Sequence, residues 1–207
     1  MTSLLTLQST LGIAGVALLG VSASAAANVF LPKNARKADR YVFIWLVFDA
    51  LIHFLYEGTF VYYSTFGRTV NTSTGIIADI WKEYALADLR WGVADPTTVA
   101  IEIITVLGAG PLCFYILHLL ANNDHRGYFW LVVLSTAEIY GGWMTFSPEW
   151  LVGSPNLETS TFLNKWVYLF FMNFIWVIVP FFVLVHAFNN ISNAFKATEA
   201  GSKRKHN

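Results

Sequence analysis

Acidic side chains and a histidine interrupt long apolar stretches of this 207-residue chain. One stretch carries Asp49, His53 and Glu57 at spacings i, i+4 and i+8, which places all three along one face of a helix. Glu102 and Glu138 lie in two further apolar stretches. Carboxyl and imidazole groups that are positioned in an apolar pocket can give and take protons. The pattern therefore predicts acid–base chemistry on an apolar substrate.

Other polar side chains accompany these groups at helical spacing. Thr105 follows Glu102 by one turn, Tyr140 lies close to Glu138, and Asn173 and Trp176 are one turn apart. The indole face of a tryptophan can stabilise a developing cation. The alternative for Trp176 is an ordinary packing or interfacial role, and most of the eight tryptophans must be structural.

The elements that must carry these residues are membrane-spanning helices, each of which needs about 20 mostly apolar residues. The chain is 56% hydrophobic and only 13% charged, unlike a soluble domain. The first stretch has no basic residue before it and is longer than a signal-peptide core, so we expect it to be retained as a span. We predict an all-α, polytopic, single-domain protein (residues 1–207) whose five spans enclose an intramembrane pocket; the spans are 4–30, 41–63, 97–121, 127–147 and 162–188.

A charged side chain at the centre of a span costs about 2.5–3.5 kcal/mol. Four carboxylates and a histidine in three helices are therefore expected to converge on one polar pocket, the alternative being scattered structural pairs. The isolated His118 and His186 suit roles at helix ends, and the single Cys113 suits a buried apolar position. Thirteen basic residues balance thirteen acidic ones, which removes the electrostatic case for nucleic-acid binding.

Basic residues predict the orientation of the chain, because Lys and Arg favour cytosolic loops. Nine of them fall in the loops 31–40 and 122–126 and in the tail 191–207, and the other four (Arg68, Lys82, Arg90 and Lys165) lie on the opposite side. This bias predicts a lumenal N-terminus and a cytosolic basic tail. The sequon Asn71-Thr72-Ser73 then lies in a lumenal loop. Lysines three and five residues from the end match an endoplasmic-reticulum retrieval pattern, for which a membrane-surface tail is the alternative.

Several strings resemble the emopamil-binding protein (EXPERA) family and occur in family order over about residues 41–190. They are IHFLYEG at 52–58, WKEY at 81–84 with Asp88 and Arg90, EIIT at 102–105 with Gly110-Pro111, IYG at 139–141, and FMNFIW at 171–176.

The resemblance implies a five-helix protein of the endoplasmic-reticulum membrane, often a homodimer, that isomerises the Δ8 double bond of a 3β-hydroxysteroid to Δ7 without metal or other cofactor. Its catalytic residues map onto His53, Glu57, Glu102, Asn173 and Trp176. We expect Thr105, Tyr140, Asp49, Glu138, Trp81 and Tyr84 to contact the substrate, although Trp81 and Tyr84 could instead mark an interfacial helix or anchor a loop.

Three positions depart from the pattern of the sterol isomerases in that family. Asp49 stands in place of an uncharged residue, Glu138 in place of a neutral amide, and Gly142 where an acid follows the Tyr-Gly pair. The alternatives are therefore an isomerase of another steroid or terpenoid, or a non-catalytic sterol-binding protein. A proton-coupled transporter is disfavoured because the sequence shows no inverted repeat.

Overall fold

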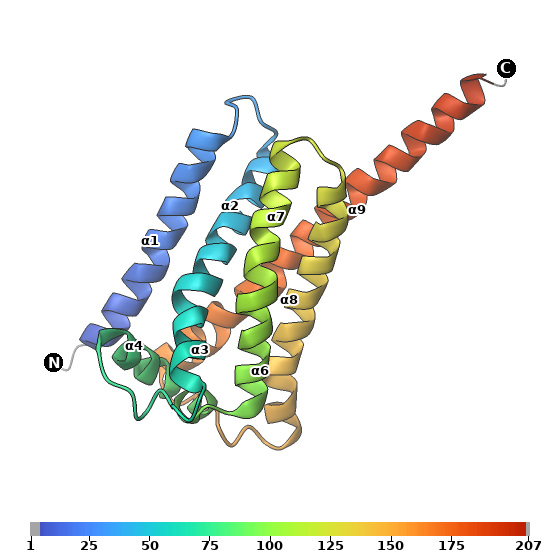
Figure 1. The fold of residues 1–207 in the computed structure, drawn as a ribbon. Coiled ribbons are helices and arrows are strands. Elements are labelled where there is room, and N and C mark those ends of the chain that lie inside the picture. Colours follow the sequence, from blue (N-terminus) through green and yellow to red (C-terminus); the bar gives the residue numbers. More distant parts are fainter. Residues whose placement is uncertain (1–4, 206–207) are drawn as a thin grey trace.

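The protein is described by a computed structural model that covers residues 5–205, and these residues form helices and no strand (Figure 1). One isolated β-bridge pairs Asp88 with Leu157. The elements in chain order are α1 (Leu7–Phe30), α2 (Lys37–Ile52), the π-helix η1 (His53–Glu57), α3 (Gly58–Ser64), α4 (Ile76–Ala85), α5 (Leu89–Val93), α6 (Pro96–Ile104), η2 (Thr105–Ala109), α7 (Gly110–Ala121), α8 (Arg126–Leu151), η3 (Leu163–Phe171) and α9 (Met172–Lys205).

Four continuous helices of the described chain are long and apolar enough to cross a membrane: Leu7–Phe30, Lys37–Ser64, Pro96–Ala121 and Leu163–Gly201. They match four of the five predicted spans and confirm the all-α membrane fold. The segment predicted as the fourth span forms α8, a helix of 26 residues, but α8 is not among these four. The count of five spans therefore stays a prediction, although α8 packs in the bundle against α7 and α9 (Figure 1).

The two ends of the bundle differ in charge. The loops after α1 and α7, and the projecting part of α9, lie at one end, while α4 and the first turn of α1 lie at the other (Figure 1). Most of the basic residues belong to the first end, as the sequence predicts. Which side of the membrane each end faces stays a prediction, and the retrieval pattern finishes on residues 206–207, outside the described range.

Capping residues set the start of several helices. Asp95 accepts hydrogen bonds from the backbone amides of Thr97 and Thr98, each at 3.0 Å, and Pro96 occupies the first turn of α6. Such an acceptor satisfies amides that have no partner inside the helix. Gly75 precedes α4 with φ of 109°, a conformation that strains residues with a Cβ. These signals fix where the chain enters the helices that form the site.

Two hydrophobic clusters lie on either side of the polar residues. At one end α2, α7 and α8 pack through side chains such as Leu46, Ile116 and Leu131, all fully buried. At the other end Phe60 of α3, Trp81 of α4 and Trp91 of α5 pack their aromatic side chains together. Apolar burial stabilises both clusters, and the polar residues lie between them.

Candidate active site

A cavity of about 580 Å³ occupies the centre of the bundle, within the range of pockets that hold drug-sized ligands. Apolar side chains form most of its wall. All the predicted site residues except Asp49 line it. The sequence thus correctly predicted that these polar groups converge, and scattered structural pairs do not describe them.

Three π-helical segments supply or adjoin the polar wall. His53 and Glu57 begin and end η1, Thr105 begins η2, and Asn173 follows η3 by two residues. A π-turn adds a residue to the helix and rotates the side chains that follow, and such turns are frequent at functional sites. The site therefore departs from regular α-helical geometry where the polar residues occur.

His53 lies between two carboxylates on its own helix. Its Nδ1 is 2.5 Å from Oε2 of Glu57, and its Nε2 is 3.1 Å from Oδ1 of Asp49. The imidazole is buried, with side-chain exposure of 1%. The predicted row of three groups is thus continuous and fixes the plane of the ring.

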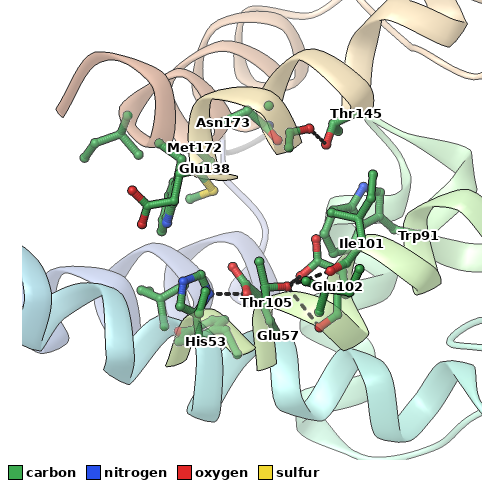
Figure 2. Close-up of a pocket in the computed structure, with 18 of the residues that line it drawn as sticks. His53, Glu57, Trp91, Ile101, Glu102, Thr105, Glu138, Thr145, Met172 and Asn173 are labelled. Atoms are coloured by element: carbon green, nitrogen blue, oxygen red, sulfur yellow. Dashed lines mark hydrogen bonds and ion pairs between the residues drawn. The ribbon is translucent and has the colours of Figure 1, made fainter. Parts of the chain in front are cut away.

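Glu102 lies in α6 and is buried in the wall beside this row (Figure 2). Its Oε2 accepts a hydrogen bond of 3.2 Å from the hydroxyl of Thr105, which also lies 2.9 Å from the backbone carbonyl of Glu102. Thr105 therefore orients the carboxyl group toward the cavity.

The opposite side of the cavity presents Glu138, Met172 and Asn173 (Figure 2). The amide nitrogen of Asn173 donates to the hydroxyl of Tyr84 at 2.9 Å and to the backbone carbonyl of Tyr168 at 2.8 Å. Burial raises the pKa of Tyr84, so its phenol stays neutral. Asn173 thereby joins the last span to α4, which is the loop-anchoring role considered for Tyr84.

Trp176 reaches Asp49 across the helix bundle. Its indole Nε1 donates to Oδ1 of Asp49 at 2.7 Å, and its ring packs against Trp45 and Phe48. Asp49 is fully buried behind His53 and Trp176, and Oδ2 accepts from the thiol of Cys113 at 3.1 Å. Asp49 therefore lies behind the cavity wall, where it holds two wall residues, and not in the position expected of a substrate contact.

Aromatic side chains close the end of the cavity nearest α4. Trp81 and Trp91 stack with ring centroids 5.2 Å apart, and Trp81 donates to the hydroxyl of Thr59 at 2.9 Å. Tyr140 also lines the cavity but is 64% exposed, which places its ring at the outer surface of α8.

Several residues of the site were not predicted from the sequence. Trp91 and Thr145 line the cavity, and the buried Arg90 ties α5 to α8. Arg90 makes hydrogen bonds of 2.9 and 2.6 Å to Asp88 and donates to the backbone carbonyl of Thr145 at 2.7 Å. The signal available in the sequence was the WKEY motif, which is followed by Asp88 and Arg90.

His118 and His186, for which the sequence suggested helix-end roles, lie outside the site at the end of the bundle that carries most basic residues. His118 is in the last turn of α7, and its Nδ1 lies 3.5 Å from the side-chain amide of Asn122. His186 is in α9, where its Nε2 lies 3.4 Å from Oδ1 of Asp39. Neither lines the cavity. His118 lies at a helix end as expected, whereas α9 continues past His186 to Lys205, so the expected helix-end position is wrong for His186.

Comparison with known proteins identifies the same family as the motifs. The family model EXPERA (EXPanded EBP superfamily) matches residues 76–187. The chain is 30% identical over 165 residues to a probable 3-beta-hydroxysteroid-Delta(8),Delta(7)-isomerase of Oryza sativa subsp. japonica, covering 80% of this chain and 74% of that protein.

Two further relatives have the same level of identity. The 3-beta-hydroxysteroid-Delta(8),Delta(7)-isomerase of Cavia porcellus is 30% identical, covering 78% of this chain and 70% of that protein. The isomeliandiol synthase MOI2 of Melia azedarach is also 30% identical, covering 78% and 74%. The match extends over most of both chains in each case, and we conclude that this chain belongs to the EXPERA (EBP) family.

Proposed function

We propose that the protein is a sterol isomerase that moves a ring double bond from Δ8 to Δ7 in a 3β-hydroxysteroid. The observation that carries the proposal is the meeting of the His53–Glu57 pair and Glu102 in one apolar cavity. The printed names of the rice and guinea-pig relatives describe this reaction.

The reaction needs one proton added and another removed. A protonated side chain gives its proton to one alkene carbon, the π electrons form the new C–H bond, and a tertiary carbocation remains on the other carbon. A neighbouring carbon then loses a proton to a basic side chain, and the electrons of that C–H bond form the new double bond. The protons balance and there is no net oxidation, so the proposed chemistry needs no external reductant or oxidant. The expectation that neither a metal nor another cofactor takes part stays a prediction.

His53, Glu57 and Glu102 are the groups that exchange these protons in our proposal. Glu57 shares a short contact with His53, so a proton can pass between them. Glu102, held by Thr105, is the second proton-exchanging group. Two separate groups allow addition and removal at different carbons of a substrate held between them.

Trp176 and Asn173 support the cationic intermediate in different ways. Trp176 lines the cavity, and its ring can face a developing positive charge. Asn173 directs its amide hydrogens to Tyr84 and to backbone carbonyls, so we assign it the positioning of the cavity wall. Trp81 and Tyr84 close the end of the site, and Tyr140 borders its outer edge.

The proposed setting is the endoplasmic-reticulum membrane, with the N-terminus lumenal and the C-terminus cytosolic. The substrate reaches the cavity from the surrounding membrane lipids. The proposal includes a homodimer as the functional assembly, on the family resemblance alone.

The test is expression of the chain in cells that lack sterol Δ8–Δ7 isomerase, followed by mass spectrometry of the sterols. We expect Δ8 sterol to fall and Δ7 sterol to rise. The variants His53→Ala and Glu102→Ala should each abolish the conversion at unchanged protein level, while Glu158→Ala, an exposed control, should not. An unchanged amount of Δ8 sterol in cells that contain the folded protein would refute the proposal.

A second candidate is isomerisation of another oxygenated terpenoid, and one observation favours it. Asp49 and Glu138 enlarge the group of acids beyond those that the sterol reaction uses, and one relative of equal similarity is named isomeliandiol synthase. Turnover of such a terpenoid without turnover of Δ8 sterol in the same cells would select this candidate, whereas binding of sterol without turnover would indicate a non-catalytic protein.

A further inference from the structure

Glu138 is a buried carboxyl group that the proposed proton transfers do not use. It lies in α8 with 7% of its surface exposed, and it lines the central cavity. Neither of its carboxyl oxygens has a hydrogen-bond partner within the described residues. Buried polar groups are nearly always paired in folded proteins, so a polar group left unpaired in a cavity wall indicates that a partner comes from the cavity.

Asp49 and His53 are the polar groups nearest to Glu138, and each of them contacts other residues of the site. Ligand-type atoms of Asp49, His53 and Glu138 lie within 4.8 Å of one another. Asp49 accepts from Trp176 and Cys113 and faces Nε2 of His53, whereas Nδ1 of His53 contacts Glu57. Asp49 is therefore occupied by other donors, whereas Nε2 of His53 faces Asp49 and makes no hydrogen bond within the described residues.

The neighbouring carboxyl group of Asp49 indicates the protonation state in which Glu138 would bind a ligand. Two carboxyl groups so close together in an apolar interior share a proton more readily than both ionise. Asp49 accepts hydrogen bonds from Trp176 and Cys113 and faces His53, so it is the better stabilised of the two as a carboxylate. A protonated Glu138 can both donate and accept a hydrogen bond, which is the pattern that a hydroxyl group complements.

The cavity around Glu138 defines the rest of the ligand. Phe48, Leu112 and Ile175 contribute apolar wall, so a ligand that fills the cavity is largely hydrocarbon. Figure 2 shows Glu138 across the cavity from Thr105 and Glu102, on the side that also presents Met172 and Asn173. An oxygen atom bound at Glu138 would therefore hold the ring system against the proton-transfer wall.

We propose that Glu138 forms a hydroxyl-binding subsite that positions an oxygenated tetracyclic lipid for proton transfer. This inference rests on the proposed function, since it takes the isomerase substrate to occupy the same cavity. It assigns the hydroxyl group of that substrate to Glu138, so that the hydroxylated ring lipid binds in preference to the corresponding hydrocarbon.

The test compares binding of a Δ8 sterol and its 3-deoxy analogue to purified protein in detergent, together with turnover of each. A hydrogen bond to a buried acid supports a preference of about tenfold or more. We expect the parent protein to bind the hydroxylated sterol more tightly by that factor. Glu138→Leu should reduce the preference to about one, and Glu138→Gln should keep most of it, because an amide still donates and accepts.

Controls separate this inference from the proposed function. Glu158→Leu changes an exposed acid and should retain the preference. Equal binding of both sterols by the parent protein would overturn the subsite. The subsite would also be overturned if Glu138→Leu and Glu138→Gln both lost turnover of the two sterols while their sterol binding stayed unchanged. Glu138 would then be a proton-transfer group. Preferential binding of the hydroxylated sterol without any turnover would leave the subsite standing and reject the isomerase.

Discussion

Asp49 offers the most informative substitution, because one buried carboxylate holds two residues of the cavity wall. Oδ1 accepts from Trp176 at 2.7 Å and lies 3.1 Å from Nε2 of His53, while Oδ2 accepts from Cys113 at 3.1 Å. Asp49→Asn keeps the shape of the side chain and removes its charge. The asparagine can accept through one oxygen only, so it cannot reproduce all three contacts.

The expected fall in kcat for Asp49→Asn follows from these contacts. A hydrogen bond to a charged group contributes about 1.5–3 kcal/mol, against about 1 kcal/mol for a neutral one. Weakening the bond to Trp176 and loosening His53 should raise the barrier by about 1.5–3 kcal/mol, which is a fall in kcat of about 10- to 100-fold. Because Asp49 lies behind the wall, KM should change little.

The assay is isomerase turnover by purified protein at several sterol concentrations, so that kcat and KM are separated. Cys113→Ala is the matched control: it removes only the contact to Oδ2, and we expect kcat to stay within about threefold, since a thiol is a weak donor. An Asp49→Asn enzyme with unchanged kcat, or one whose defect lies wholly in KM, would refute a positioning role.

Three further substitutions test other parts of the structure. Arg90→Ala leaves the buried Asp88 without its partner and should destabilise the protein by about 3–5 kcal/mol, seen as a lower melting temperature in detergent; an unchanged melting temperature would contradict a structural role for the pair. Trp176→Phe keeps an aromatic ring but loses the bond to Asp49, and kcat should fall about tenfold or more at similar KM; full activity would show that the indole nitrogen is dispensable. Tyr84→Phe removes one acceptor of Asn173, which retains backbone acceptors, so kcat should stay within about threefold; abolished turnover would instead make the phenol a proton carrier.

Much of the site could be predicted from the sequence because polar residues in apolar helices are costly. His53, Glu57 and Glu102 stand out in segments that otherwise favour the membrane, and their spacing places them on inward faces. The same reasoning predicted three of the spans closely, and it predicted the start of the last one, whose helix continues past the predicted end at 188 to Gly201. It was weakest for α8, whose polar residues lower its hydropathy although it packs within the bundle.

Whether each side chain reaches the cavity or stays behind its wall could not be predicted from the sequence. Helical spacing puts Asp49 on the face of His53, but whether it enters the cavity depends on Trp176 and Cys113 from other helices. The π-turns at His53 and Thr105 also rotate the helices in a way that no spacing rule anticipates. Contacts between distant segments, such as Arg90 with the carbonyl of Thr145, follow only from the assembled fold.

The most direct test of the central claim is isomerisation in heavy water. Purified protein is incubated with a Δ8 sterol in D₂O, and the product is analysed by mass spectrometry and NMR. If buried acid–base groups protonate the alkene, the Δ7 product carries one deuterium at the carbon that was protonated, and neither His53→Ala nor Glu102→Ala yields labelled product. Folded protein that binds the sterol and leaves it unconverted, or a Δ7 product formed at full rate by both variants, would contradict the claim.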